Sequence, residues 1–343
     1  MIIDPKLKLD FCDVLLVPTE SDLESRKQVS LSRSFHFRWS KDKISCIPVC
    51  AANMHKTGTL RMARVLSSYG MITCLSKHIE PLDIDMFLEE KEENEYCLNY
   101  VAFSSGSRKD DICRIVSLLE KYHQVKMVCL DVANGYCKSF LNFIKDFRKD
   151  YPDKVIIAGN VVTSDQACKI IENGADIVKV GIGSGSVCTT RRMTGIGYPQ
   201  LSAIVDMQKN VHECGGLIMS DGGCQNAGDI AKALAANSDF VMLGGMLAGH
   251  DECIHSEEED HTVFYGMSSY HAMENHYGNV SDYRASEGKI VSISSKGPVE
   301  NTVKEILGGM RSACTYLNAS SIEDISKNAS FIQVNRQLNG MFS

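Results

Sequence analysis

Residues 154–181 read KVIIAGNVVTSDQACKIIENGADIVKVG, and this stretch decides the fold because it holds two strands and the helix between them. The runs at residues 154–161 and 176–181 are almost continuously apolar, which is typical of parallel strands covered on both faces. Residues 165–173 form an amphipathic segment of helical length. This strand–helix–strand unit indicates an α/β fold.

The ends of this helix carry residues that helix ends favour. Thr163 and Ser164 precede it and are expected to cap its first turn through their side-chain oxygens. Gly174 follows it, where a left-handed backbone is common.

The same unit recurs along the chain. Apolar runs of strand length occur eight times, at residues 46–52, 71–75, 100–103, 126–132, 154–161, 176–181, 217–220 and 239–243. Amphipathic segments of helical length lie between them, at residues 59–69, 139–151, 165–173, 199–214 and 227–237. This alternation predicts a closed (β/α)8 barrel (TIM barrel) in a single domain over residues 1–343, with an open doubly wound sheet as the alternative.

Two segments lie outside the alternation. Residues 1–45 form an N-terminal extension before the first strand. Residues 248–299 follow the eighth strand and precede a last helix near residues 302–317. Because this long segment is polar and rich in turn residues, it is expected to be an active-site flap and not a separate domain.

Composition narrows the class of protein. The chain has 343 residues, a net charge of −7 and no run of lysine or arginine, so nucleic acid is not an expected partner. Its 14 cysteines form no zinc-type pairs, which favours a reducing compartment over a disulfide framework. No apolar run of signal-peptide or membrane-span length occurs, and we expect a cytoplasmic protein that does not bind membranes.

A reactive cysteine is expected in the loop after the sixth strand. Residues 181–197 read GIGSGSVCTTRRMTGIG and place Cys188 in a glycine-rich, cationic turn. Arg191 and Arg192 would favour its thiolate, which is the nucleophilic form. The alternative is a cysteine buried as a small apolar residue, and this is the expected role of most of the other cysteines.

Paired glycines follow the last two strands, at Gly222–Gly223 and Gly244–Gly245. Barrels commonly bind a phosphate between these two loops through backbone N–H groups, so we expect a phosphorylated ligand here. Each pair could instead serve only as a tight turn. Asp221 precedes the first pair, and its carboxylate is expected to accept hydrogen bonds from ribose hydroxyls.

Other polar residues at strand ends have two interpretations each. Asp131 either orients a polar ligand or caps the next helix, and Lys77 either binds a phosphate or caps a carbonyl. Glu287, in the segment 283–288, is either a proton donor or relay or a solvated partner of Arg284. The histidines show no metal-ligand spacing, and no strand is followed by a GxGxxG dinucleotide turn with an acidic residue at the usual distance.

Five segments together resemble the IMP dehydrogenase and GMP reductase superfamily. They are LDFCDVLLVP (residues 9–18), AANM (51–54), the Cys188 loop, SDGG (220–223) and GMRS (309–312). Within it, TGIGYPQLSA (194–203) and YRASEG (283–288) are similar to the reductase branch. The chain also lacks the regulatory insertion of about 120 residues that dehydrogenases usually carry.

The resemblance implies that GMP is converted to IMP and ammonia with oxidation of NADPH. Cys188 would attack C2 of guanine, and Thr190 and Glu287 would protonate the departing amine. The product of that step is a thioimidate on the sulfur, which hydride from NADPH then reduces.

The resemblance also implies binding residues. For GMP they are Ser184, Asp221, Gly222, Gly223, Gly244, Gly245, Gly266, Met267, Ser268, Arg284, Ala285, Ser286, Glu287 and Gly288. For the cofactor they are Lys77, Asp131, Val132, Ala133, Ile182, Gly183, Met267, Tyr283 and Arg284, with Ser25, Arg26, Ser312, Ala313, Cys314 and Thr315 reaching across a subunit boundary. For potassium they are Gly183, Gly185, Cys188 and Arg191. Ser184 stands where relatives often have proline, and a homotetramer is expected.

Two other functions remain open from the sequence. One is the dehydrogenase reaction, which oxidises IMP with NAD and water. The other is a nucleotide sensor that keeps the phosphate loops without turnover.

Overall fold

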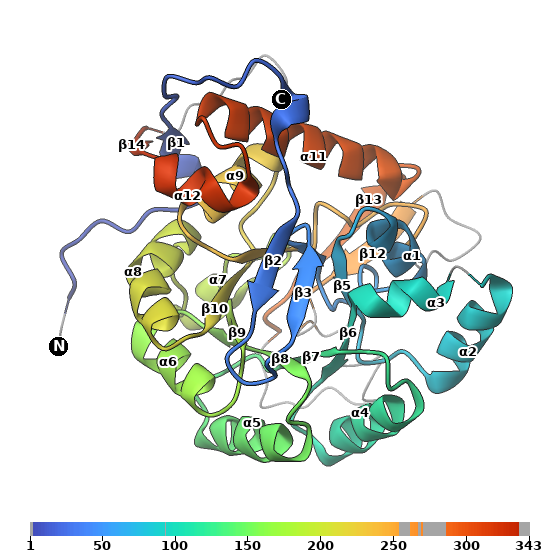
Figure 1. Cartoon of the computed structure of the whole chain (residues 1–343). Helices are drawn as coiled ribbons and strands as arrows, with labels where there is room; N and C mark the ends of the chain where they lie inside the picture. Colours follow the sequence, from blue (N-terminus) through green and yellow to red (C-terminus); the bar gives the residue numbers. More distant parts are fainter. Residues whose placement is uncertain (1–2, 93, 254–260, 267–268, 270–285, 336–343) are drawn as a thin grey trace.

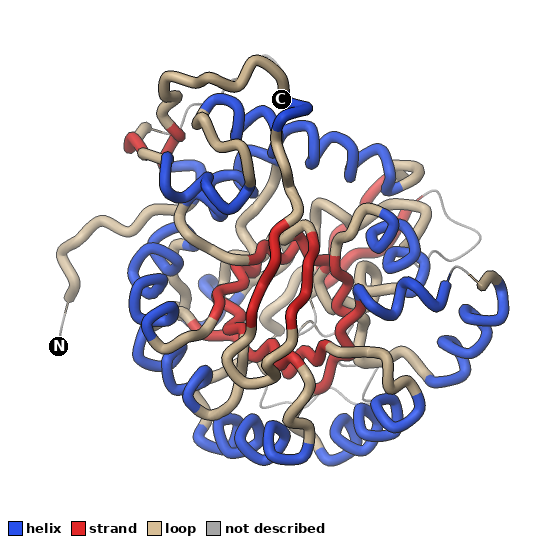
Figure 2. The backbone as a smooth tube through the Cα atoms, viewed as in Figure 1, coloured by secondary structure: helices blue, strands red, loops and turns tan. Residues whose placement is uncertain are grey.

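Eight parallel strands close into a barrel, and the helices surround it (Figures 1 and 2). The structure is a computed structural model that describes residues 3–92, 94–253, 261–266, 269 and 286–335. The barrel strands are β4 (Val49–Ala51), β5 (Ile72–Cys74), β6 (Val101–Ser105), β7 (Met127–Asp131), β8 (Val155–Val161), β9 (Ile177–Val180), β10 (Leu217–Asp221) and β11 (Phe240–Leu243). Closure is made by β11 pairing with β4, where Val241 lies opposite Val49. The predicted barrel is confirmed, and the open sheet is wrong.

The outer helices follow the strands in sequence order. They are α1 (Leu60–Ser68), α2 (Pro81–Glu90), α3 (Asn94–Cys97), α4 (Lys109–Lys121), α5 (Lys138–Asp150), α6 (Ser164–Glu172), α8 (Gln200–Glu213), α9 (Ala227–Ala235) and α11 (Val299–Tyr316). Each barrel strand is buried on both sides, because its outward side chains pack under these helices and its inward side chains fill the barrel. None of the helices in the described ranges combines the length and the apolar character needed to cross a bilayer.

The capping of α6 differs from the prediction. Thr163 holds the N-cap position, and its carbonyl accepts the N–H of Ala167 at 3.0 Å. Its side chain makes no capping bond and instead hydrogen-bonds the hydroxyl of Tyr136 at 3.0 Å. The expected side-chain cap is therefore wrong, whereas Gly174 has the expected positive φ of +123°.

The N-terminal extension closes the amino end of the barrel with a hairpin of β2 (Arg33–His36) and β3 (Lys43–Cys46), which lies across the barrel in Figure 1. Phe35 packs against Phe240 of the barrel interior with ring centroids 4.2 Å apart. The predicted strand at 46–52 is thus two strands, because the chain passes from the hairpin into β4 at this point.

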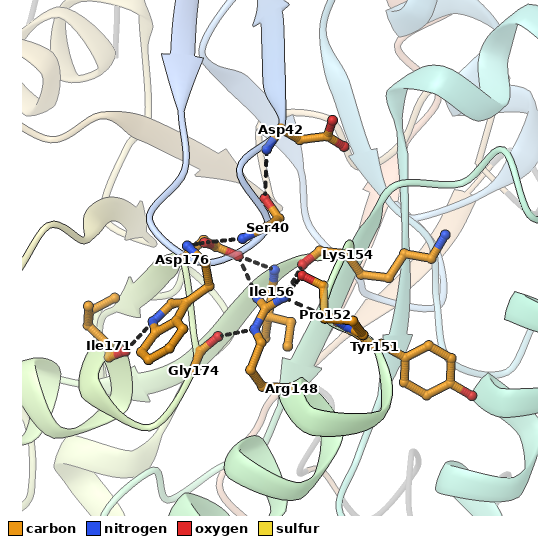
Figure 3. A network of polar contacts seen from close by, with 11 residues as sticks. Ser40, Asp42, Arg148, Tyr151, Pro152, Lys154, Ile156, Ile171, Gly174 and Asp176 are labelled. Atoms are coloured by element: carbon orange, nitrogen blue, oxygen red, sulfur yellow. Dashed lines mark hydrogen bonds and ion pairs between the residues drawn. The ribbon is translucent and has the colours of Figure 1, made fainter.

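A buried ion pair fixes this hairpin to the barrel (Figure 3). Arg148 of α5 donates from Nη2 to Asp176 Oδ2 at 2.6 Å, and its other nitrogens bind the carbonyls of the nearby turns. Asp176 accepts the backbone N–H of Trp39 in the hairpin at 2.8 Å and that of Ile156 in β8 at 3.1 Å. Because one carboxylate serves three segments, the hairpin, α5 and β8 are held in one register.

The C-terminal part of the chain packs against α9. Here β1 (Val14–Leu16) pairs antiparallel with β14 (Phe331–Gln333), beside α12 (Ile325–Asn328) and α11. The long segment after β11 contains an antiparallel pair, β12 (His261–Tyr265) and β13 (Ile290–Ser294). This pair brings Gly266 and Gly288 over the carboxyl ends of the barrel strands, where a flap was expected.

Candidate active site

A pocket opens at the carboxyl ends of the barrel strands and collects most of the predicted residues. Those that line it are Asp131, Val132, Ala133, Ile182, Gly183, Ser184, Gly185, Cys188, Thr190, Asp221, Gly222, Gly223, Gly244, Gly245, Gly266 and Glu287. They come from loops after β7, β9, β10 and β11 and from the segment that holds β12 and β13. The barrel therefore brings together residues that are far apart in the sequence, as the site of a (β/α)8 fold requires.

Cys188 lies in a loop that is hydrogen-bonded to residues 287–288, just before β13. Its N–H donates to the carbonyl of Gly185 at 3.0 Å, and it forms an antiparallel bridge with Gly288. The next N–H, that of Thr189, donates to the carbonyl of Glu287 at 2.9 Å. These backbone contacts fix the side chain of Glu287 beside the cysteine loop.

A chain of three side chains starts at the cysteine sulfur. Cys188 Sγ donates to Thr190 Oγ1 at 3.2 Å, and Thr190 Oγ1 donates to Glu287 Oε2 at 2.7 Å. Thr190 is the first residue of the short helix α7 (Thr190–Thr194), and Glu287 lies 97 residues further along the chain. The arrangement provides a path for a proton from the thiol to a carboxylate and back.

The contacts of the two arginines after Cys188 leave their predicted effect on its thiolate a prediction. Arg191 forms an ion pair with Asp10 at 3.2 Å and donates to the carbonyl of Tyr198 at 2.6 Å. Arg192 is exposed. The S–H of Cys188 donates to the hydroxyl of Thr190.

The paired glycines at the ends of β10 and β11 keep the pocket open. Gly222 and Gly223 have φ angles of +95° and +88°, which L-residues rarely adopt. A Cβ at Gly245 would come within 2.5 Å of Ser186 Oγ, and one at Gly244 within 3.0 Å of a methionine sulfur. Glycines at the ends of two neighbouring strands therefore line the pocket, and this is a common arrangement for binding phosphate through backbone N–H groups.

A network of charged and amide side chains lies at the bottom of the pocket. Lys179 Nζ lies 3.1 Å from Asp131 Oδ2, 3.4 Å from Asp221 Oδ2 and 3.3 Å from Asn53 Oδ1. Asn53 donates to Asp131 at 2.6 Å, and Asn160 donates to Asp221 at 2.8 Å. Burial acts to raise the pKa of Asp131, but the charge of Lys179 together with the hydrogen bonds from Asn53 and Lys179 outweighs it, and the pKa lies below its usual value.

The lysine of this network stays charged. Burial lowers the pKa of Lys179, yet the neighbouring charges, with Asp131 the largest, raise it well above the usual value. Asp131 is the last residue of β7, and Cys137 holds the N-cap of α5. The interpretation of Asp131 as a helix cap is therefore wrong.

Several predicted cofactor residues do not line the pocket. Lys77 forms an ion pair with Asp111 at 3.2 Å. Ser25 and Arg26 are exposed at the start of the short 3-10 helix η2 (Arg26–Gln28). The remaining four, Ser312, Ala313, Cys314 and Thr315, lie on α11, where Cys314 is fully buried in the core and has no side-chain surface to offer.

The structure does not test five of the predicted site residues. Met267, Ser268, Tyr283, Arg284 and Ala285 lie outside the described residues. Of their neighbours, Ser286 donates from Oγ to the carbonyl of Gly288 at 3.0 Å, which supports the turn at the cysteine loop.

The metal prediction rests on carbonyl oxygens. In the part of the chain that the structure describes, no cluster of three His, Cys, Asp or Glu side chains could hold a metal ion. The Gly185 carbonyl accepts the N–H of Cys188, and the Arg191 carbonyl accepts that of Gly195. Each carbonyl keeps a second lone pair, so the donor class still fits a hard cation.

Sequence reasoning missed three residues of the pocket floor, Asn53, Asn160 and Lys179. Asn160 and Lys179 are single polar residues within apolar strands, β8 and β9. A lone polar residue near the carboxyl end of a barrel strand is the signal that could have identified them, because side chains there face the site.

Comparison with known proteins gives the class of this fold and site. A family model described as IMP dehydrogenase / GMP reductase domain matches residues 8–339. The chain therefore belongs to the IMP dehydrogenase / GMP reductase family.

Its relatives point to one branch of the family. The chain is 51% identical to GMP reductase 2 of Mus musculus over 99% of this chain and 98% of that protein. It is 50% identical to GMP reductase 1 of Homo sapiens, with 99% of both chains covered. It is 48% identical to GMP reductase of Yersinia enterocolitica, over 100% of this chain and 99% of that protein.

Proposed function

We propose that this chain is an NADPH-dependent oxidoreductase that converts GMP to IMP and ammonia. The observation that carries the proposal is the hydrogen-bonded chain Cys188–Thr190–Glu287 at the pocket, with steps of 3.2 and 2.7 Å. Full-length similarity to proteins named GMP reductase supports the choice of reaction. The reaction consumes GMP, NADPH and one proton and gives IMP, NADP and ammonia.

The first step forms a bond between sulfur and purine. The S–H of Cys188 passes its proton through Thr190 Oγ1 to Glu287 Oε2, and the sulfur attacks C2, the electron-poor carbon between two ring nitrogens. An amide-like amine does not leave as an anion. The proton held by Glu287 returns through Thr190 to the amine nitrogen, and ammonia leaves a thioimidate on Cys188.

The second step releases the sulfur. NADPH, when bound, supplies hydride to C2. For that transfer, the Gly185 carbonyl and the bridge to Gly288 hold Cys188 in place. The C–S bond breaks and IMP is released, and the Cys188 thiolate takes up the one proton that the overall reaction consumes, which solvent supplies to the relay of Glu287 and Thr190.

The two ligands are proposed to occupy opposite sides of the barrel mouth. In the order of the strands around the barrel, β7 lies across from β11. Gly244 and Gly245 after β11, with Gly222 and Gly223 after β10, would hold the phosphate of GMP. Asp131, the last residue of β7, has a side chain that is 31% exposed and would bind the cofactor.

Three finer points belong to the same proposal. Potassium is proposed at the carbonyls of Gly183, Gly185, Cys188 and Arg191, and activity should fall when potassium is replaced by choline. A homotetramer is proposed, which the mass of the native particle tests. A cytoplasmic location is proposed, supported by fourteen cysteines that form no disulfide.

A kinetic assay tests the reaction. The proposal predicts NADPH consumption with GMP and no NAD reduction with IMP and water, and the reverse pattern would favour the dehydrogenase. Cys188→Ala separates an enzyme from a sensor, since an enzyme should lose nearly all turnover while it still binds GMP. Unchanged NADPH consumption in Cys188→Ala would exclude the covalent route.

A further inference from the structure

Lys179 is the most deeply buried charge of the pocket, and the mechanism above does not use it. Its side chain is 2% exposed and comes from β9, in a strand that is otherwise apolar. Gly159 on the neighbouring strand makes room for it, because a Cβ there would lie 2.5 Å from Lys179 Cβ. A buried charge is costly to maintain, so its partners indicate what it does.

Its two charged partners belong to different sides of the site. Asp131 ends β7 and lies on the side proposed for the cofactor, whereas Asp221 ends β10 beside the phosphate loops. The two aspartate side chains are 31% and 23% exposed, whereas the lysine side chain beneath them on the pocket floor is 2% exposed. One buried cation therefore supports two carboxylates that face ligands.

The hydrogen bonds of the two carboxylates leave one oxygen of each for a ligand. The contacts recorded for Asp131 go to Oδ2, from Asn53 and Lys179. Those for Asp221 also go to Oδ2, from Asn160 and Lys179. Within the described residues, Oδ1 of each carboxylate has no recorded side-chain partner, and a fixed orientation of this kind lowers the cost of ligand binding.

We propose that Lys179 is a positioning residue that holds Asp131 and Asp221 in one network and thereby supports binding on both the nucleotide side and the cofactor side of the pocket. The proposal rests on the proposed function for the identity of the two ligands. It makes Lys179 act through the carboxylates, without contact with the reacting atoms.

The test is to measure Kd for GMP and for NADPH in the full-length chain with Cys188→Ala present, so that no adduct forms. Lys179→Met should weaken both ligands by about tenfold or more, because each carboxylate loses its buried counter-charge. Asp221→Asn should weaken GMP alone, and Asp131→Asn should weaken NADPH alone. Lys179→Arg keeps the charge and should lose less affinity than Lys179→Met for both ligands.

A double-variant comparison separates positioning from general damage. When Asp221→Asn is already present, Lys179→Met should cause little further loss of GMP affinity, since the lysine acts through that carboxylate. The same fold loss in both backgrounds would overturn the proposal, as would a loss confined to one ligand. Lys209→Met, at a lysine whose side chain is 78% exposed, is the matched control and should change neither Kd.

Two further outcomes keep the test decisive. If Lys179→Met alone fails to fold, the comparison is made with Asp131→Asn present in both proteins, where one charge of each sign is removed. GMP binding should still be weaker with Lys179→Met added, and equal binding would overturn the proposal. Failure of the proposed function is recognised separately, because the wild-type chain would then consume no NADPH with GMP.

Discussion

Removing the hydroxyl of Thr190 should interrupt the relay between Cys188 and Glu287. Thr190→Val keeps the shape of the side chain and deletes the atom that lies 3.2 Å from the sulfur and 2.7 Å from the carboxylate. A positioned acid–base group typically contributes about 10²–10⁴-fold to a rate. At about 1.4 kcal/mol for each factor of ten, the barrier to ammonia loss should rise by about 3–6 kcal/mol.

The assay separates the two halves of the reaction. Ammonia release and adduct formation from GMP alone report deamination, and NADPH formed from IMP and NADP reports the hydride half. Glu287→Gln and Thr190→Val should slow deamination much more than the hydride half, because only deamination needs a protonated amine. At alkaline pH, where thiols ionise without help, the hydride half should recover and deamination should not.

The relay also predicts the rate of a double variant and of a matched control variant. Glu287→Gln with Thr190→Val should be about as slow as either single variant, since both act in one path. Thr189→Val is the matched control: among the described residues its hydroxyl donates only to the carbonyl of Ser286, at 3.5 Å, and most activity should remain. Equal slowing of both halves at every pH would refute the relay.

Three more predictions concern binding and stability. Gly222→Ala should raise the KM for GMP on the order of tenfold, because the φ angle of Gly222 is +95° and a Cβ there would lie 2.6 Å from Ser184 Oγ. An unchanged KM would contradict the proposal that the loop of Gly222 and Gly223 binds the phosphate. Arg148→Met should lower the free energy of unfolding by about 3–5 kcal/mol in denaturant titrations, because the fully buried carboxylate of Asp176 loses its partner. A loss below about 1 kcal/mol would mean that the ion pair contributes little to stability. Burial, together with the charge of Lys296, lowers the pKa of His250. The unfolded chain therefore binds more protons than the folded chain, and stability should fall as pH drops below about 6.5. His250→Asn should make that fall in thermal stability less steep, and an unchanged pH dependence would contradict the prediction.

The barrel could be predicted from the sequence because each strand and helix carries its own local pattern. The apolar runs at residues 154–161 and 176–181 become β8 and β9 with shifts of one residue at their ends. The hairpin could not be predicted in this way, since Phe35 and Phe37 are buried by contacts with barrel residues far along the chain. The run at residues 46–52 likewise divides between hairpin and barrel for a tertiary reason.

The site shows the same division. Cys188 and the paired glycines could be predicted as site residues because loop composition and strand position are local features of the sequence. The ion-pair partner of Arg191 could not be predicted from the sequence, because Asp10 lies 181 residues away along the chain. The role of Lys179 could not be predicted for a related reason, because its partners Asp131 of β7 and Asp221 of β10 come next to it only in the folded barrel.

The most direct test of the central claim is mass spectrometry of the wild-type chain quenched during turnover with GMP. The account predicts a purine nucleotide attached to the peptide that carries Cys188, formed with release of ammonia and lost when NADPH is supplied. A chain that turns over GMP with no nucleotide on that peptide, or with the nucleotide on another cysteine, would contradict it.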